Sequence, residues 1–158
     1  RGQRRVWNRN PDIDVVQKPA RFEPAHFDLY RRYQAGRHPD SGMNDADPQK
    51  YLGFLASRQV DTAFFELRME DRLLGIAVAD VLPDGLSAVY TFYDPVQPRR
   101  GLGVYAVLWE IAETARRGLD YLYLGYWIAE SPKMSYKTNY QPVEALRAGR
   151  WIQLTSPR

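Results

Sequence analysis

The segment DPVQPRRGLGVY, residues 94–105, combines two arginines with two glycines. An apolar stretch, LSAVYTFY, precedes it and a helical pattern follows, so we expect a strand before the loop and a helix after it. The first turn of a helix attracts phosphate through unpaired backbone N–H groups and the helix dipole. Arg99 and Arg100 add charge-assisted donors, and Gly101 and Gly103 let a ligand approach the backbone. The segment predicts a phosphate-binding loop, with a tight turn and solvated arginines as the alternative.

A second group of polar side chains lies in YLYLGYWIAESPKMSYKTNY, residues 121–140. Lysine ammonium groups bind carboxylates, and tyrosine hydroxyl and asparagine amide groups orient polar ligands. Tyrosines after a strand are also common at the rim of a core, and surface lysines are commonly solvated. The residues by themselves leave both interpretations open.

Asp94 and the two histidines complete the candidates. Asp94 could take a proton or hold an ammonium group, but aspartate before proline is equally a turn residue. His26 and His38 are too few and too far apart to predict a metal site, and we expect His26 to pack beside its helix. Cysteine is absent, which excludes disulfides and cysteine metal sites in these residues. We therefore expect no metal and no cofactor in this chain.

Composition favours one compact soluble domain. Hydrophobic residues make up 44% and charged residues 26% of the 158 residues, and no apolar run approaches the roughly 20 residues of a membrane span. The lack of cysteine fits a cytoplasmic protein. The net charge is only +3, but RGQRRVWNRN carries four arginines and no acid. We expect residues 1–20 to be an extended basic linker, with a phosphate-contacting arm as the sharper alternative.

The elements that position these residues follow from periodicity and caps. One helix is expected in FEPAHFDLYRRYQAGRHP, and a second begins at Pro48, capped by Asp47. Strands are expected in TAFFELRM, LLGIAVADVL, LSAVYTFY and YLYLGYWI, with a long helix between the last two and a small tail at the end. We expect a mixed α/β domain in which the first three strands are antiparallel and the fourth joins in parallel.

This order of elements, with R-R-G-L-G before the long helix, resembles the N-acetyltransferase superfamily. The usual pattern there is Gln or Arg, two residues, Gly, one residue, and Gly or Ala. Here Pro98 holds the leading position, with Gln97 and Arg99 beside it. This departure argues against ordinary coenzyme A binding.

Longer sequence motifs are more specific than this loop pattern. VYTFYDP, RGLGVYAVLWEIA, YLYLGYWI, KMSYKTNYQPVEAL and GRW together resemble the C-terminal domain of aminoacyl-tRNA–protein transferases, the leucyl- and arginyl-transferases of the N-degron pathway. LYRRYQAGRHPDSGM resembles the same family's first helix and loop. The family's N-terminal domain carries a cysteine cluster for a metal or an iron–sulfur cluster. The resemblance implies that residues 1–20 connect to that missing domain and that 21–158 form an N-acetyltransferase-like catalytic domain.

The implied reaction moves leucine from leucyl-tRNA to an N-terminal Asp or Glu of a protein, which marks that protein for degradation. The ester is already activated, so the enzyme must position the reactants, polarise the carbonyl and take one proton. The implied partners are aminoacyl-tRNA and proteins with acidic N-termini, without a membrane or DNA.

The resemblance implies three groups of site residues. The catalytic candidates are Asp94, Tyr136 and Lys137. The candidates for tRNA binding are Arg99, Arg100, Gly101, Leu102, Gly103 and Tyr105, with a phosphate track extended by the N-terminal arginines, Arg116 and Arg117. The candidates for substrate binding are Arg37, His38, Tyr126, Trp127, Lys133, Asn139 and Tyr140.

Roles follow within these groups. Lys133, Lys137 and Arg37 would recognise the acidic first residue of the substrate. Hydroxyl and amide groups would orient the peptide or the ester, and aromatic rings would wall the pocket. Three alternatives stay open: an arginyl donor, a coenzyme A-dependent N-acetyltransferase, and a non-catalytic module that binds acidic N-termini or RNA.

Overall fold

The structure is a computed structural model that describes residues 2–37 and 47–154. The chain divides into two compact units, Arg1–Tyr123 and Leu124–Arg158. The helices and strands of the first unit are α1 (Gly2–Arg9), β1 (Asp14–Pro19), α2 (Pro24–Arg37), α3 (Pro48–Leu55), β2 (Asp61–Met69), β3 (Arg72–Val81), β4 (Gly85–Tyr93), α4 (Leu102–Arg116) and β5 (Tyr121–Tyr123). The second unit contains a short 3-10 helix, Ser135–Asn139, followed by β6 (Val143–Arg147) and β7 (Arg150–Leu154).

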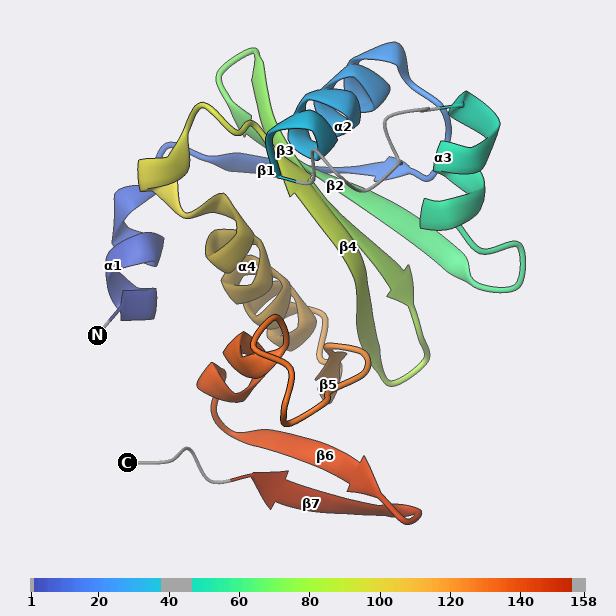
Figure 1. The fold of residues 1–158 in the computed structure, drawn as a ribbon, viewed down its shortest axis with the longest axis vertical. Helices are drawn as coiled ribbons and strands as arrows, with labels where there is room; N and C mark the ends of the chain where they lie inside the picture. Colours follow the sequence, from blue (N-terminus) through green and yellow to red (C-terminus); the bar gives the residue numbers. More distant parts are fainter. Residues whose placement is uncertain (1, 38–46, 155–158) are drawn as a thin grey trace. The chain divides into compact units, whose positions relative to one another are not determined.

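The first unit is built on a five-stranded sheet in the order β1-β2-β3-β4-β5 (Figure 1). β1 to β4 pair antiparallel, and β5 pairs parallel with β4 after the α4 crossover. Both pairing directions were predicted from the connections and are confirmed. Short turns permit only antiparallel neighbours, whereas a long helix can return the chain to the same end of the sheet.

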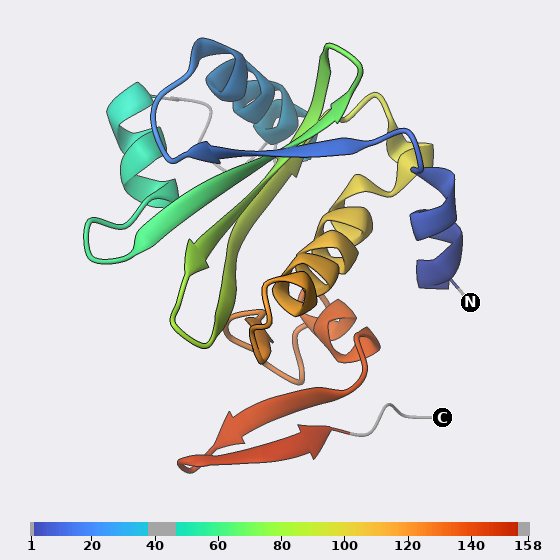
Figure 2. The same ribbon diagram turned by 180° about the vertical axis from the view of Figure 1, so that it is seen from behind.

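Helices cover both faces of this sheet because its strands carry apolar side chains on both sides. Phe65 contributes to a core under α4, and its neighbour Phe64 contributes to a core under α2 and α3. Successive side chains of a strand point to opposite faces, so one β2 segment serves both cores. Figure 2 shows α1 and α4 on one side and α2 and α3 on the other.

The predicted helix starts are confirmed where local chemistry sets them. Pro24 opens α2, and the Asp47 carboxylate accepts a hydrogen bond from the Gln49 backbone N–H at 2.9 Å at the start of α3. Gly101 precedes α4 with φ +65°, a conformation that glycine adopts without a steric penalty. The starts of these helices are thus set by residues next to them in the sequence.

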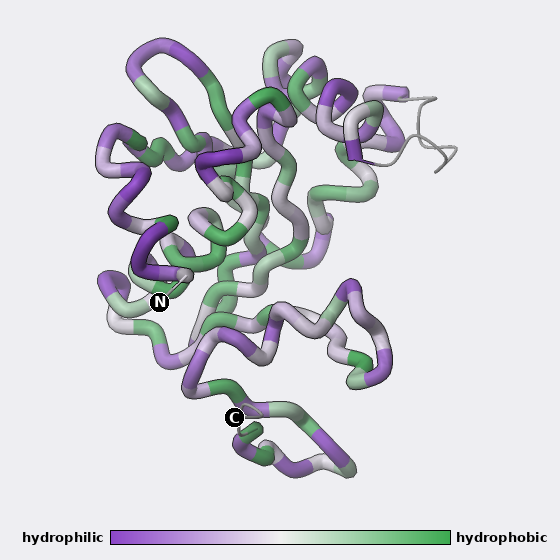
Figure 3. The backbone as a smooth tube through the Cα atoms, turned by 60° about the vertical axis from the view of Figure 1, so that its left-hand side comes forward, coloured by the Kyte–Doolittle hydropathy of each residue, from purple (hydrophilic) through white to green (hydrophobic). Residues whose placement is uncertain are grey.

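The expectation of an extended N-terminal linker was wrong for its first half. Gly2–Arg9 is a helix, and Trp7 stacks on Tyr105 of α4 with 5.6 Å between ring centroids. The helix is largely hydrophilic (Figure 3), and the contacts of Trp7 with Tyr105 and of Val6 with Gly101 identify its inner face. β1 then adds an edge strand to the sheet. Residues 1–20 therefore lie within the first unit, and the division of the chain falls after Tyr123.

The predicted strand at 121–128 is shorter in the structure. β5 ends at Tyr123, and Gly125 has φ +74°, which does not fit a continuing strand. The predicted short tail segments form the β6–β7 hairpin, whose turn residues Ala148 and Gly149 both have positive φ. Among the described residues, no helix has both the length and the apolar character needed to cross a membrane.

Candidate active site

The end of β4 carries Asp94, which the structure ties into the scaffold. Its carboxylate accepts hydrogen bonds from Arg72 at 2.6 Å, Arg32 at 3.3 Å and the Val96 backbone N–H at 3.2 Å. The side chain is 2% exposed. These contacts support the turn interpretation of Asp94 and do not support its predicted catalytic role.

The glycine loop between β4 and α4 is packed against the N-terminal segment. A Cβ atom on Gly101 would lie 3.2 Å from Val6 of α1. The Asn10 amide donates to the Arg100 carbonyl at 2.9 Å, and the Arg9 guanidinium donates to the Arg99 carbonyl. The loop adopts the predicted strand–loop–helix geometry, but α1 and the following turn lie against it.

Arg100 forms a bidentate ion pair with Asp12, at 2.9 and 2.8 Å. This pair lowers the pKa of Asp12, chiefly through the hydrogen bonds from Arg100. The Arg100 guanidinium also donates to the Asn10 side chain at 3.1 Å. An arginine held by three oxygen atoms of its own chain is not available to a phosphate, so the predicted tRNA contact of Arg100 is not supported.

The other predicted tRNA-binding residues divide by exposure. The Arg99 side chain is exposed and stays a candidate. Leu102 is 1% exposed and belongs to the core under α4, so its side chain cannot meet RNA. Gly103 lies against the ring of Tyr93, 3.2 Å from where a Cβ atom would stand. Tyr105 is buried under Trp7.

A cluster of tyrosines that the sequence did not identify as a site lies between α2 and β4. Tyr33 packs edge-on against Tyr93 at 4.9 Å and against Tyr90 at 6.3 Å. Burial raises the pKa of Tyr33 to about 12, and the predicted substrate residue Arg37 partly offsets this rise from beside its hydroxyl. The Gln34 amide donates to the Tyr90 hydroxyl at 3.2 Å. The pattern showed Tyr33 only as part of a helix face, because the approach of β4 is a tertiary feature.

The second unit brings together several predicted substrate residues around Lys137. The Lys137 ammonium group donates to the backbone carbonyl of Tyr126 at 2.5 Å. It lies close to Gly125, where a Cβ atom would stand 3.8 Å away. Burial lowers the pKa of Lys137, which brings its neutral, basic form nearer to physiological pH. Tyr126 projects its own side chain outward and is 91% exposed.

Aromatic contacts order the rest of this unit. Tyr136 packs edge-on against Tyr140 at 6.4 Å, with Tyr140 buried and Tyr136 exposed. The Arg147 guanidinium lies over the Trp127 ring at 5.4 Å. Asn139 ends the 3-10 helix that also carries Lys137, and Lys133 is exposed just before it. The second unit therefore presents hydroxyl, amide and ammonium groups from a short segment, while Arg37, Asp94 and the glycine loop belong to the first. His38 lies outside the described residues.

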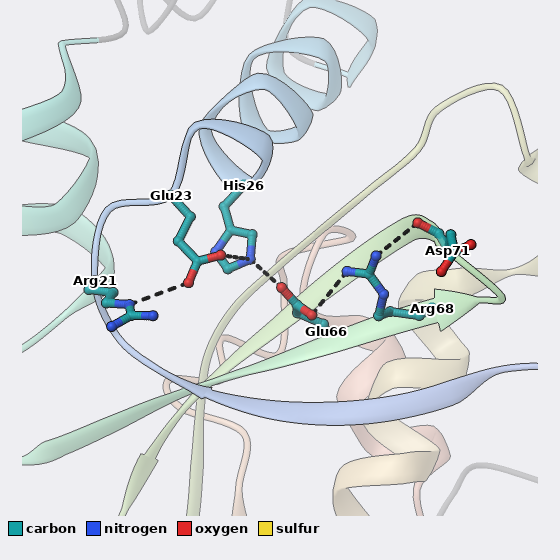
Figure 4. Close-up of polar contacts among 6 residues, drawn as sticks. All are labelled: Arg21, Glu23, His26, Glu66, Arg68 and Asp71. Carbon is teal, nitrogen blue, oxygen red and sulfur yellow. Dashed lines mark hydrogen bonds and ion pairs between the residues drawn. The ribbon is translucent and has the colours of Figure 1, made fainter.

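A buried polar network joins α2 to β2 in the first unit (Figure 4). His26 Nε2 and Glu66 Oε1 lie 2.6 Å apart, and the Arg68 guanidinium donates to Glu66 at 3.1 Å. Burial acts to raise the pKa of Glu66, but the hydrogen bonds from His26 and Arg68 outweigh it and lower that pKa. His26 is buried, in agreement with its predicted packing role.

The same network groups three potential metal ligands, Glu23, His26 and Glu66, within 4.8 Å of one another. The sequence did not suggest this group, because its members come from three places: the residue before α2, α2 itself and β2. The observed distances are those of polar contacts between side chains. His26 Nε2 lies 2.6 Å from Glu66 Oε1 and 3.5 Å from Glu23 Oε2. The contacts describe a structural link between helix and sheet.

Glu110 of α4 is a further buried carboxyl group that the sequence did not single out. The residue is fully buried, and neither oxygen has a hydrogen-bond partner among the described residues. Burial raises the pKa of Glu110 to about 8. In the sequence, the only sign of this buried carboxyl group would have been a glutamate within an otherwise apolar helix face.

Comparison with known proteins places the fold and the family. An N-acetyltransferase of Escherichia coli that acts on ribosomal protein S18 alanine has a TM-score of 0.56 to this chain, with 16% identity, covering 84% of this chain and 79% of that chain. The predicted N-acetyltransferase-like fold is thereby confirmed. The family model described as "Arginine-tRNA-protein transferase, C terminus" matches residues 25–147.

Curated relatives agree with this family. An aspartate/glutamate leucyltransferase of Pseudomonas paraeruginosa is 50% identical over 155 residues, which are 98% of this chain and 66% of the relative. A protein of the same name from Nitrosococcus oceani is 47% identical over 152 residues, 96% of this chain and 64% of the relative. The chain thus spans about two thirds of the length of these relatives. By sequence it belongs to the aminoacyl-tRNA–protein transferase family represented by the arginine-tRNA-protein transferase C terminus.

Proposed function

We propose that this chain transfers leucine from leucyl-tRNA to the N-terminal Asp or Glu of acceptor proteins in the cytoplasm, and so marks them for degradation. The observation that carries the proposal is the 50% identity to an aspartate/glutamate leucyltransferase over 98% of the chain. The N-acetyltransferase-like framework fits this reaction, since both reactions acylate an amine.

The chemistry asks little of the protein. The α-amino group of the acceptor has a pKa of about 7.7–8, so part of it is neutral and nucleophilic at cellular pH. Its nitrogen attacks the ester carbonyl, the bond from that carbon to the ribose oxygen breaks, and one proton passes from nitrogen to the leaving oxygen. The groups needed are a base, donors that polarise the carbonyl, and contacts that position both substrates.

Lys137 is the candidate base, because burial lowers its pKa and a fixed hydrogen bond to Tyr126 holds its position. The hydroxyl of Tyr136 is the candidate donor to the ester carbonyl. Lys133 of the second unit is exposed and is the candidate cation for the acidic side chain of the acceptor. Arg37, exposed on the first unit, is a separate candidate for the same role. Trp127, Asn139 and Tyr140 complete the substrate group in this proposal.

The role we give Asp94 is positioning. Its ion pairs join the end of β4 to Arg32 of α2 and Arg72 of β3, next to the tyrosine cluster. Arg99 is the remaining arginine of the glycine loop with an exposed side chain, and it is the candidate contact for a tRNA phosphate. Removing it should weaken tRNA binding and reduce its salt dependence.

An arginyl donor is the second candidate, favoured by the name of the matching family model. Coenzyme A-dependent acetylation has a weaker basis. Pro98 stands at the start of the loop pattern, and α1 packs on Gly101 where a pyrophosphate would need the backbone. A non-catalytic module for acidic N-termini or RNA is the remaining alternative.

The test is a transfer assay followed by the mass of the acceptor peptide. The chain is mixed with leucyl-tRNA or arginyl-tRNA and a peptide that begins with Asp, and a peptide that begins with Asn is the matched control. We expect leucine to be added to the Asp peptide and not to the Asn peptide. Addition of arginine alone would show that the donor is arginyl-tRNA and not leucyl-tRNA. Failure with both donors, also after fusion to a cysteine-bearing N-terminal domain of a relative, would reject a transferase function.

A further inference from the structure

A hollow of about 520 Å³ lies between α1 and α4 in the first unit. We call it the aromatic groove; its lining includes Trp7, Asn8, Tyr105, Trp109, Glu113 and Arg116. Its volume falls within the range of about 300–1,000 Å³ that is typical of small-ligand sites. A second hollow of about 440 Å³ also borders on Trp109 and Arg116 and extends toward β1.

The groove offers an aromatic platform at its rim. Trp7 is 41% exposed, although its ring stacks on buried Tyr105 with an interplanar angle of 29°. Trp109 is held beside it by contact with Phe65, at 4.8 Å between centroids. An exposed tryptophan that is anchored on one side suits a flat ligand that stacks on the ring, because every nucleobase has a π-face.

A positive charge lies next to this platform. Arg4 is exposed on α1 one turn before Trp7, whereas Arg5 and Arg9 lie on another face of this helix, which has no acidic residues. The Arg116 side chain in the groove lining is 72% exposed, but its guanidinium donates two hydrogen bonds of 2.7 Å to Glu113. We therefore assign the phosphate contact to Arg4, because a positive charge beside an aromatic ring favours a ligand that combines flat rings with phosphates.

We propose that the aromatic groove binds unpaired nucleotides of RNA, with a base stacked on Trp7 and a phosphate at Arg4. The inference rests on the proposed function, because that function supplies a tRNA whose amino-acid-bearing end is single-stranded. Asn8 is exposed at the groove and offers its amide group to a base edge. The groove would then take over the role that the sequence gave to Arg100, whose guanidinium is occupied by Asp12.

The test measures direct binding of a fluorescein-labelled oligoribonucleotide that ends in CCA, by fluorescence anisotropy. Trp7→Leu removes the ring and keeps an apolar side chain, and Trp7→Phe restores an aromatic ring. We expect Trp7→Leu to raise the Kd about 5- to 150-fold, the range for loss of one base–aromatic stack, and Trp7→Phe to stay within about threefold of the parent chain. Circular dichroism of each variant verifies folding.

Two matched variants separate stacking from general effects. Trp151→Leu removes another exposed tryptophan, on β7, and should leave the Kd unchanged. Arg4→Gln should weaken binding and reduce the slope of log K against log salt by about 0.7 for its lost phosphate contact, whereas Trp7→Leu should leave this slope unchanged. Equal losses from Trp7→Leu and Trp151→Leu would overturn the proposal.

The binding assay is independent of aminoacyl transfer, so the two proposals fail separately. Normal RNA binding that depends on Trp7, with no transfer, would reject the transferase and retain the groove. If transfer is normal and Trp7→Leu does not change the Kd for RNA, the groove proposal is rejected and the transferase proposal is retained. Absence of oligonucleotide binding by the parent chain, or Trp7-dependent binding of a labelled Asp peptide in place of RNA, would also overturn the groove.

Discussion

Lys137 holds its ammonium group against the Tyr126 carbonyl, in a partly buried position that lowers its pKa. If it serves as the base, both Lys137→Met and Lys137→Arg should reduce kcat/KM about 10²- to 10⁴-fold, because an arginine cannot release its proton at neutral pH. The parent enzyme should gain activity with rising pH and reach its plateau below the ordinary lysine value of 10.5. The measurement is the pH profile of peptide transfer. An arginine variant that retains activity would instead make Lys137 a carboxylate anchor.

At the scale of elements, the contact between α2 and β2 depends on the charged form of Glu66. Hydrogen bonds from His26 and Arg68 lower the pKa of this carboxyl group against the opposing effect of burial. A lowered folded-state pKa stabilises the fold above the ordinary value of 4.5, and the contribution disappears as the pH falls through the folded-state pKa. Glu66→Gln should therefore reduce the free energy of unfolding by about 1–3 kcal/mol at pH 7 and by less at pH 4.

Glu110 on α4 provides the matched control for that experiment, because the same substitution should have the opposite pH dependence. Burial raises its pKa in the folded chain to about 8, whereas the ordinary value is 4.5. Between these two values the unfolded chain ionises and the folded chain does not, so the free energy of unfolding falls as the pH rises. Glu110→Gln should gain stability relative to the parent chain between pH 4 and pH 7. Urea unfolding of both variants at the two pH values measures this. Parallel behaviour of the two variants would contradict the assignment of opposite shifts.

At the scale of the whole molecule, the two units divide the proposed work. The sheet, the glycine loop and the aromatic groove belong to Arg1–Tyr123, and Lys137 belongs to Leu124–Arg158. A chain ending after Tyr123 should unfold cooperatively and bind the CCA oligonucleotide, because both cores and the groove are retained, but it should not transfer an amino acid. Urea unfolding, anisotropy and the transfer assay measure these three properties against the full chain. Non-cooperative unfolding of the shorter chain would contradict the independence of the first unit.

Much of the first unit was predictable because the signals are local. Alternation in TAFFELRM, the Asp47 cap and the Gly101 turn each depend on neighbours within a few residues. The N-terminal helix was missed because RGQRRVWNRN is mostly polar, with Val6 and Trp7 as its large apolar residues, and its helical form is supported by the stack of Trp7 on Tyr105. Tertiary packing overrides a weak helix propensity where it supplies the stabilising contact.

The sequence by itself determined the order of elements from α2 onward, the antiparallel pairing of β2 to β4, the parallel pairing of β5, the glycine loop and, through family motifs, the class of enzyme. Tertiary structure decided which charged groups are available for chemistry. Asp94 meets Arg32 from 62 positions away, and Arg100 meets Asp12 from 88 positions away. Periodicity and caps act over one or two turns, whereas an ion pair between distant segments exists only after the sheet and its helices have brought the partners together. The same packing of α1 on α4 created the aromatic groove.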